Sequence, residues 1–390
     1  MAEERSDEVD EARGRALWHA AQRGHVPDLD TALPVAKEWL QRALRMALGN
    51  NHAGCVRALL AHCARRWPVF QGSVRSQIID EYMRIGALPH VRCLRRTPLA
   101  CALFHGSLEA AQVLVDMGAN VDKPFDDHDL TPLALATDQG HVRCLQLLID
   151  ARARVDVPDE NGVTPVARAA GAGHVQIVTL LVLAGASVNV CDACPTAPLW
   201  KAAAGGHEAC VEALICAKAD VDQKGGIYKN LPLSTAAARG YLGVVHALIA
   251  AGADVDLGNY DAPIFLASKN GHTDVVQALL AADADVDQRN GDGWYALHHA
   301  AQHGHAATIQ ALVDADADVD VDDQYGVTPL HVAARGGYRL AVLRLIQGKA
   351  NVNYRDEQGD TALDEVDEER YPSLARLLIA AGAHGGDGPW

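Results

Sequence analysis

Apolar residues recur along this chain in pairs of short stretches, each with helical spacing and each pair followed by a polar segment. The stretch after Thr328 is typical. Thr328 is a good N-cap, and Pro329 occupies the first helical position, where its missing N–H costs nothing. Gly336 and Gly337 end this helix, and the aliphatic residues of 341–346 predict a second one. The pattern therefore predicts a pair of short helices followed by an extended segment and a turn.

This two-helix pattern repeats at an almost constant interval. The successive unit starts lie 34, 33, 33, 34, 31, 33, 33 and 33 residues apart. A period of this length indicates stacked supersecondary units that each contact their neighbours, and not one globular core. The starts are Thr97, Thr131, Thr164, Ala197, Leu231, Ala262, Tyr295, Thr328 and Thr361.

Equivalent positions within the units carry equivalent residues. Alanine stands five positions after each of the first eight starts, which predicts close helix approach, and aliphatic pairs such as Leu345-Ile346 are predicted to fill the core between units. The position before the alanine that follows each second helix suits a left-handed C-cap. Glycine fills it at Gly118, Gly185, Gly252 and Gly382, aspartate at Asp283 and Asp316, and strained cationic residues at Arg152, Lys218 and Lys349.

Together, Thr-Pro-Leu-His, Ala-Ala-x-x-Gly-His and Gly-Ala-Asp-Val-Asp resemble the ankyrin repeat. The resemblance implies an all-α repeat fold, an ankyrin-type α-solenoid of helix-turn-helix units with β-hairpin fingers. It also implies a curved array that binds partners on its concave face. Asn189 and Asn353 match the finger position at which members of the family can be hydroxylated.

The chain divides into four expected parts. Residues 1–64 form degenerate N-terminal units and a cap, 65–96 an Arg-rich insertion, 97–384 nine repeats, and 385–390 a tail. The insertion is expected to be an elongated hairpin packed on its neighbours or a protrusion that binds a partner. The ninth repeat is expected to be a polar C-terminal cap, with five acidic residues on its first helix: Asp364, Glu365, Asp367, Glu368 and Glu369.

Charge is distributed unevenly around a formal net value of −16. Residues 41–96 carry ten arginines and two acidic residues, whereas the array from residue 97 onward is strongly acidic and would repel nucleic acid and anionic membranes. Nine scattered cysteines, an acidic N-terminus and the lack of long apolar stretches indicate an intracellular protein with reduced thiols. We expect a cytoplasmic location, with the nucleus left open.

The histidines and aspartates recur with the repeat, and their arrangement, like that of the cysteines, does not predict a catalytic site. The Gly-His histidines recur in frame, and His298 and His331 are expected to hydrogen-bond the helix cap or the adjacent finger. Cys191-x-x-Cys194 lies at the wrong end of the first helix to share a zinc ion with His207 and Cys210, and the paired aspartates are interpreted as solvated. The sequence predicts no metal, no cofactor and no enzymatic activity.

The positions left free by packing predict where a partner binds. Exposed aromatic residues concentrate binding energy, and four stand on consecutive fingers. With neighbouring polar residues, the candidate protein-binding set is Tyr228, Tyr260, Trp294, Tyr325, Asp292, Arg239, Lys269, His303 and Arg335.

The predicted function is a monomeric scaffold or adaptor that binds a protein or peptide of basic character. We expect no nucleic acid, membrane or small-molecule substrate. The alternatives are a targeting subunit of a ubiquitin ligase or phosphatase complex, and an inhibitor that covers an enzyme's active site.

Overall fold

The computed structural model describes residues 2–33, 37–66, 97–124, 130–189, 197–226, 230–258 and 260–385. It divides into two compact units, Met1–Val188 and Asn189–Trp390, and each is described by itself. The described residues contain helices and turns, and no helix among them is both long and apolar enough to cross a membrane. The expected insertion at 65–96 lies almost entirely outside the described residues.

The N-terminal unit begins with a long helix, α1 (Ala2–Arg23), that packs on α2 (Val26–Ala32) and α3 (Lys37–Gly49). Helix α2 also contacts α4 (Ala53–Arg66), so residues before Thr97 form helix pairs like those after it. Three regular pairs follow in this unit: α6 (Pro98–Phe104) with α7 (Leu108–Asp116), α8 (Pro132–Asp138) with α9 (Val142–Asp150), and α10 (Pro165–Ala172) with α11 (Val175–Leu183).

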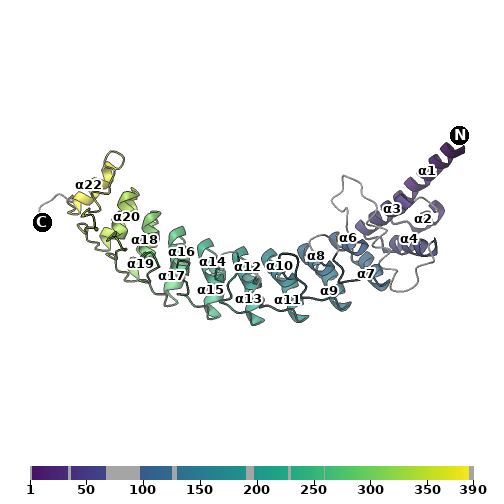
Figure 1. The fold of residues 1–390 in the computed structure, drawn as a ribbon, viewed down its shortest axis with the longest axis horizontal. Coiled ribbons are helices and arrows are strands. Elements are labelled where there is room, and N and C mark those ends of the chain that lie inside the picture. The colour runs from purple at the N-terminus through teal and green to yellow at the C-terminus, as the bar shows by residue number, and fades with distance from the viewer. Residues whose placement is uncertain are drawn as a thin grey trace. The chain divides into compact units, whose positions relative to one another are not determined.

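The C-terminal unit holds two parallel rows of helices, visible in the green to yellow part of Figure 1. The first helices of successive repeats pack on one another: α12 (Pro198–Gly205), α14 (Pro232–Arg239), α16 (Pro263–Asn270), α18 (Ala296–Gln302) and α20 (Pro329–Arg335). The second helices form the other row: α13 (Glu208–Cys216), α15 (Leu242–Ala250), α17 (Thr273–Leu280), α19 (Ala306–Asp314), α21 (Arg339–Gln347) and α22 (Pro372–Ala380).

The core of each repeat is made of the residues that the period singled out. The alanine five positions after each of the first eight starts is fully buried, as are Leu248 and Leu345 of the aliphatic pairs. Their partners Ile249 and Ile346 are only half-buried, so the first member of each pair fills the core and the second covers it. Threonine caps the helices as predicted: Thr97 accepts a hydrogen bond from the backbone N–H of Ala100.

The left-handed C-cap is present at every position where the sequence predicted it. Glycine takes positive φ there without strain, whereas Arg152, Lys218 and Lys349 are held at φ of 61°, 66° and 70°. The left-handed conformation predicted at these three residues is therefore confirmed.

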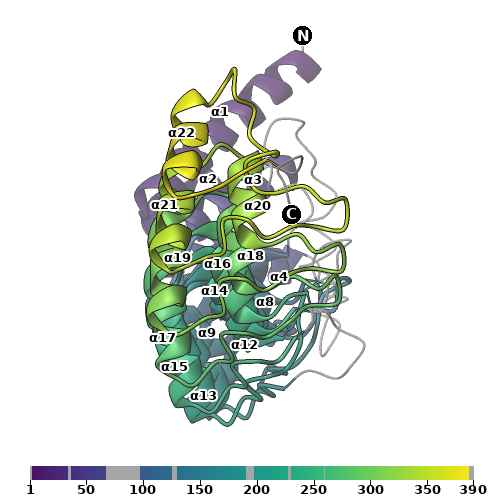
Figure 2. The ribbon, with the colours of Figure 1, turned by 90° about the vertical axis from the view of Figure 1, so that its left-hand side faces the viewer.

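The fingers differ from the β-hairpins that the resemblance implied, which are not confirmed. In the described residues the only β-bridge pairs Gly225 with Asn230. Figure 2 shows the fingers of the C-terminal unit as loops that leave the first-helix row on the side away from the second helices.

An aspartate closes the finger loop before Thr328. Asp323 Oδ1 accepts from the backbone N–H groups of Tyr325 and Val327, at 2.8 and 3.0 Å, while Gly326 turns the chain at φ 74°. Asp159, Asn290 and Asp356 do the same in their own loops. The loop is thus shaped by side-chain to backbone bonds and not by a strand ladder.

The last repeat also departs from expectation, because its acidic segment does not form a first helix. Residues 361–371 form turns, and only the second helix, α22, is present. Asp364 accepts from the backbone N–H of Thr361, and Asp367 from that of Arg370, so each aspartate closes a single turn. Pro372 disfavours helical geometry at the residue before it. Assigning five acidic residues to a helix was therefore wrong.

Candidate functional site

Two sets of histidines link first helices to their neighbours, one set to the preceding repeat and the other to the next finger. The Gly-His ring reaches back to the preceding repeat: His272 Nε2–H donates to the carbonyl of Ala238 at 3.3 Å, and His305 Nε2–H to that of Lys269 at 3.0 Å. The His305 ring also covers Gly271, whose backbone lies too close for a Cβ atom. These contacts confirm a structural role for the in-frame histidines.

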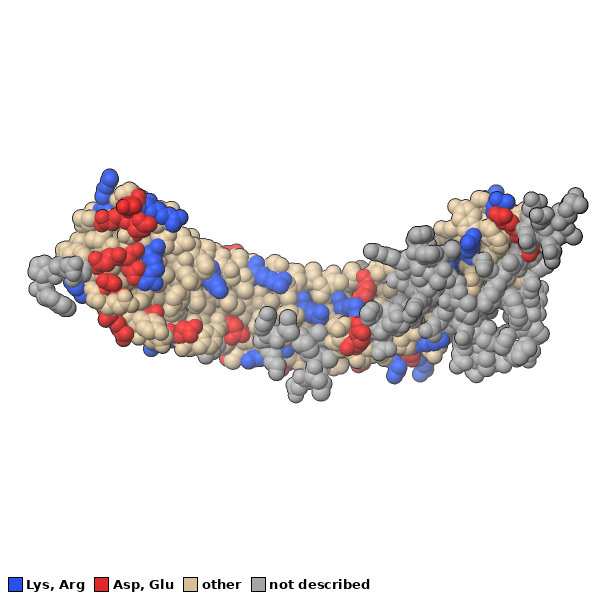
Figure 3. Space-filling view, turned by 45° about the horizontal axis from the view of Figure 1, so that its top comes forward, with Lys and Arg blue, Asp and Glu red and all other residues tan. Residues whose placement is uncertain are grey.

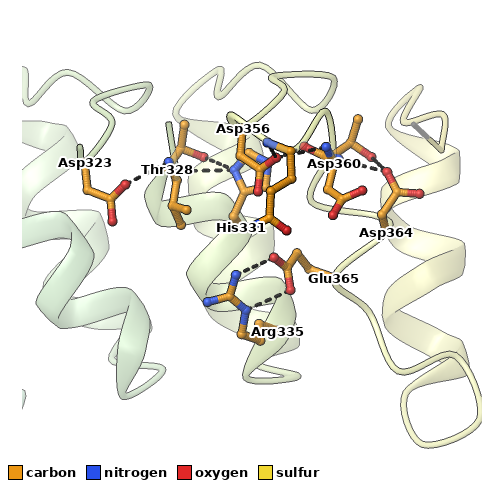
Figure 4. Close-up of polar contacts among 11 residues, drawn as sticks. Asp323, Thr328, His331, Arg335, Asp356, Asp360, Asp364 and Glu365 are labelled. Carbon is orange, nitrogen blue, oxygen red and sulfur yellow. Dashed lines mark hydrogen bonds and ion pairs between the residues drawn. The ribbon is translucent and has the colours of Figure 1, made fainter. Parts of the chain in front are cut away.

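The histidine three positions into a first helix joins its own cap to the next finger. His331 Nδ1 accepts from the backbone N–H of Thr328 at 3.2 Å, and its Nε2–H donates to the carbonyl of Asp360 at 3.2 Å (Figure 4). His298 makes the same pair of bonds, to Tyr295 N–H and to the Val327 carbonyl. Burial lowers the pKa of His298 to about 4, so it is neutral at pH 7. Both halves of the prediction, cap and finger, are confirmed.

The second polar residue of each Asp-x-Asp pair has a partner, contrary to its interpretation as solvated. Asp256 accepts from the backbone N–H of Asp285 at 2.9 Å, and Asp287 from that of Asp318 at 3.1 Å. Burial raises the pKa of the Asp287 carboxyl, and the bond from Asp318 N–H opposes that shift. Equivalent bonds between neighbouring repeats are accepted by Asp122, Asp156, Asn189, Asp222, Asp320 and Asn353. The recurrence of an Asx residue 25 positions after each of the first eight starts was the signal for this ladder.

These inter-repeat bonds position a groove between the fingers and the ends of α18 and α20. Its volume is about 470 Å³. Trp294 and Tyr325 line it from the fingers, Gln302 and Arg335 from the helix ends, and Asp323, Asp356 and Glu365 supply carboxylates.

The charged groups of the groove differ in whether they form an ion pair. The Arg335 guanidinium forms a two-pronged ion pair with Glu365, with Nε donating to Oε2 at 2.7 Å (Figure 4), and this bond raises the pKa of Arg335. Asp323 and Asp356 form no ion pair among the described residues; their oxygens accept from N–H groups of the fingers, and their charges add to the effect of Glu365 on the pKa of Arg335. The groove therefore keeps a net negative charge.

A family model described as ankyrin repeats (3 copies) matches residues 64–161, 123–192, 166–259 and 264–356, which is well over half of the chain. The chain belongs to the ankyrin repeat family. Ankyrin repeats are generally protein-interaction modules, and the family is typically non-catalytic. The search of the curated proteins found no match.

The aromatic residues of the predicted ankyrin finger surface fall into two classes. Trp294 immediately precedes the cap residue and packs inward, with its indole N–H donating to Asp323 at 3.2 Å and its ring 5.3 Å from that of His299. Tyr325 and Tyr260 stand nearer the finger tips, with 57% and 54% of their surfaces exposed. The differing distance of each aromatic residue from its unit start was the sequence signal for this division.

The structure brings only part of the predicted set together. Trp294, Tyr325 and Arg335 line one groove, and Tyr260 is linked to Asp292 on the next finger by a 3.5 Å hydrogen bond. The groove's carboxylates and Gln302 were absent from the predicted set. Arg239, Lys269 and His303 lie exposed at the ends of α14, α16 and α18. Tyr228 lies outside the described residues, as do Cys191 and Cys194.

Metal chemistry finds no support in the described part of the chain. No group of three histidine, cysteine, aspartate or glutamate side chains there could hold a metal ion. The arrangement instead offers exposed rings, carboxylates and amides, which are groups suited to binding a polypeptide.

Proposed function

We propose that the protein is a non-catalytic scaffold that holds a basic segment of a partner protein in the groove lined by Trp294 and Tyr325. One observation carries the proposal: the groove combines an exposed aromatic ring with two carboxylates, Asp323 and Asp356, that form no ion pair with a cation of the described residues. A lysine or arginine side chain gains from both groups, because an aromatic face attracts cations and a carboxylate pairs with them.

The surroundings of the groove favour the same kind of partner. Residues 351–370 contain eight acidic and two basic side chains. Figure 3 shows acidic side chains gathered toward the C-terminal end of the molecule's C-terminal unit. A field of one sign speeds the approach of an oppositely charged partner and weakens with salt.

Amide side chains suit an extended segment. Gln302 and Gln358 line the groove and are exposed, and each amide can both donate to and accept from a partner's backbone.

Five free cysteines among the described residues, four of them buried, support an intracellular location for the scaffold.

Peptide selection tests the proposal. Random 12-residue peptides displayed on phage are selected on the full chain, and the affinity of each selected peptide is measured by fluorescence anisotropy. We expect enrichment of lysine and arginine, and a loss of about tenfold or more in affinity for Tyr325→Ala, as for a central interface aromatic.

The matched control is Leu340→Ala, which removes an apolar side chain of similar exposure from α21, away from the groove. It should leave the affinity unchanged. Selected peptides without basic residues, or equal affinities for the Tyr325 variant and the wild type, would contradict the proposal.

A further inference from the structure

A band of basic residues borders the groove on the first-helix row. Arg239, Lys269 and His303 lie at the C-terminal ends of α14, α16 and α18, and all three are exposed. We call these residues, with His299 of α18, the basic band. The Arg239 guanidinium donates to the carbonyl of Ala204 at the end of α12.

Carboxylates do not neutralise this band. In the described parts of the chain, neither Arg239 nor Lys269 forms an ion pair, whereas Arg335, which occupies the same position in its repeat as Lys269, is paired with Glu365. The contrast is sharp in a protein of net charge −16, where carboxylates outnumber cations. The cations of the band are therefore available to an anion from another molecule.

His299 adds a donor that has no acceptor. The amide of Asn290 donates to His299 Nε2 at 3.5 Å, which places the ring proton on Nδ1. This Nδ1 is buried without a hydrogen-bond partner, and such groups are rare in folded proteins.

The groups around the two histidines of the band are basic. Burial lowers the pKa of His299 to about 4, and His298, Lys269 and His303 lower it further. The pKa of His303 is lowered by burial and then by His305 and Lys269. The lowered pKa leaves the His299 ring neutral at pH 7, so Arg239 and Lys269 carry the positive charge of the band and His299 contributes a hydrogen-bond donor.

The basic band and the groove meet at α18. Trp294 lines the groove and lies 5.3 Å from the His299 ring, and Gln302, which also lines the groove, is the neighbour of His303 in sequence. A polypeptide segment that occupies one can therefore continue into the other.

We propose that the basic band receives acidic side chains of the same partner segment whose basic residues occupy the groove. This inference rests on the proposed function. The bound segment is then bipolar, with its acidic part toward α14 and α16 and its basic part toward α20 and the finger at Asp356. Because the two regions have opposite charge, a segment of reversed polarity meets repulsion at both ends, and the scaffold selects one direction of the chain.

The peptides selected on the full chain test this inference. We expect them to carry aspartate or glutamate on one constant side of their basic residues. Replacing those acidic residues by glutamine or asparagine should weaken binding to the wild type about fivefold in 50 mM salt, and less in 200 mM salt. The double variant Arg239→Gln/Lys269→Gln should bind the acidic and amide peptides equally.

The matched control is Arg344→Gln/Arg376→Gln, which removes two exposed cations from α21 and α22 and should preserve the preference for the acidic peptide. Selected peptides without acidic residues, or a preference that survives in the Arg239/Lys269 variant, would overturn the inference. If that happens while Tyr325→Ala still weakens binding, the groove proposal stands alone. If the acidic preference follows Arg239 and Lys269 but Tyr325→Ala has no effect, the groove proposal fails and the band remains. A selection that yields no binding peptide contradicts both.

Discussion

The repeats that begin at Thr328 and Thr361 are neighbours, yet only the first of them forms a first helix. Thr328 and His331 bond each other in both directions across the helix start, and His331 also donates to the next finger at Asp360. In the last repeat Asp364 accepts from the backbone N–H and the hydroxyl of Thr361, and the Thr361 hydroxyl also lies 3.0 Å from the carbonyl of His384, after α22. The threonine is kept, whereas the histidine that joins a cap to the next finger is replaced by an aspartate.

This difference shows what holds a short helix in the array. A helix of seven residues is marginal alone, since nucleation is costly and few bonds follow it. Helix α20 is covered by neighbours on both sides, through α18 and through residues 356–365, which contact His331 and Arg335. Among the described residues, the repeat that begins at Thr361 has a neighbouring helix pair on one side only, and its sequence replaces apolar helix positions with carboxylates. Cover from both sides, more than the local cap, decides whether the first helix forms.

Truncation of a buried leucine should give the largest difference in unfolding free energy between the two repeats. Leu345 of α21 and Leu378 of α22 are both fully buried. We expect Leu345→Ala to cost about 3–4 kcal/mol and Leu378→Ala about 2 kcal/mol, because the terminal site is enclosed on one side and can collapse. Urea unfolding followed by far-UV circular dichroism measures both. Equal costs would mean that the terminal repeat is packed as tightly as an interior one.

Loss of the histidine link should have the next largest effect on the unfolding free energy. His331→Ala leaves the buried Thr328 N–H unpaired and removes one of the two hydrogen bonds that the Asp360 carbonyl accepts, and each lost bond costs on the order of 1 kcal/mol, so about 2 kcal/mol in total. Asp364→Ala removes an exposed carboxylate and should cost about 1 kcal/mol. The same unfolding experiment compares them, and a larger cost for Asp364 would contradict the importance of the link.

A change of pH extends the comparison, because the caps of α18 and α20 use histidine and the cap at Thr361 uses a carboxylate. The folded-state pKa of His298 is about 4, below its ordinary value of 6.5, so the unfolded chain takes up a proton first. The stability that the neutral ring contributes is complete above about pH 6.5 and is lost as the pH falls toward 4. His298→Gln keeps a capping side chain without this titration, so the difference in unfolding free energy between pH 7 and pH 4.5 should shrink by about 2 kcal/mol. An unchanged pH dependence would exclude His298 as the titrating group.

The repeat and its packing could be predicted from the sequence because the residues that produce them recur at fixed positions of each unit. Buried Ala333, the caps at Thr328 and Thr97, and the strained residue Lys349 all follow from spacing and local stereochemistry. Periodicity alone cannot show that the aspartates bond the next repeat, since an exposed carboxylate and a bonded one have the same sequence pattern.

The candidate site was harder to predict because it depends on where side chains from different repeats meet. Trp294 and Tyr325 were predicted, but Asp323 and Asp356 were not, and the pairing of Arg335 with Glu365 requires the turn that replaced a helix. A contact that depends on an irregular segment cannot be found from the regular ones.

The smallest expected effect compares the residues that follow α21 and α22. Lys349 and Gly382 occupy the same left-handed position, at φ 70° and 95°. Lys349→Gly should raise the unfolding free energy by about 0.5–1 kcal/mol, because relief of backbone strain exceeds the entropy that glycine adds to the unfolded chain. Arg152→Gly and Lys218→Gly should act alike, whereas Gly382→Ala should destabilise by a similar amount. Differential scanning calorimetry resolves such changes as shifts in melting temperature. If all three glycine variants melt where the wild type does, the cationic residues hold this conformation at no cost, and the interior and terminal repeats are equivalent at this position.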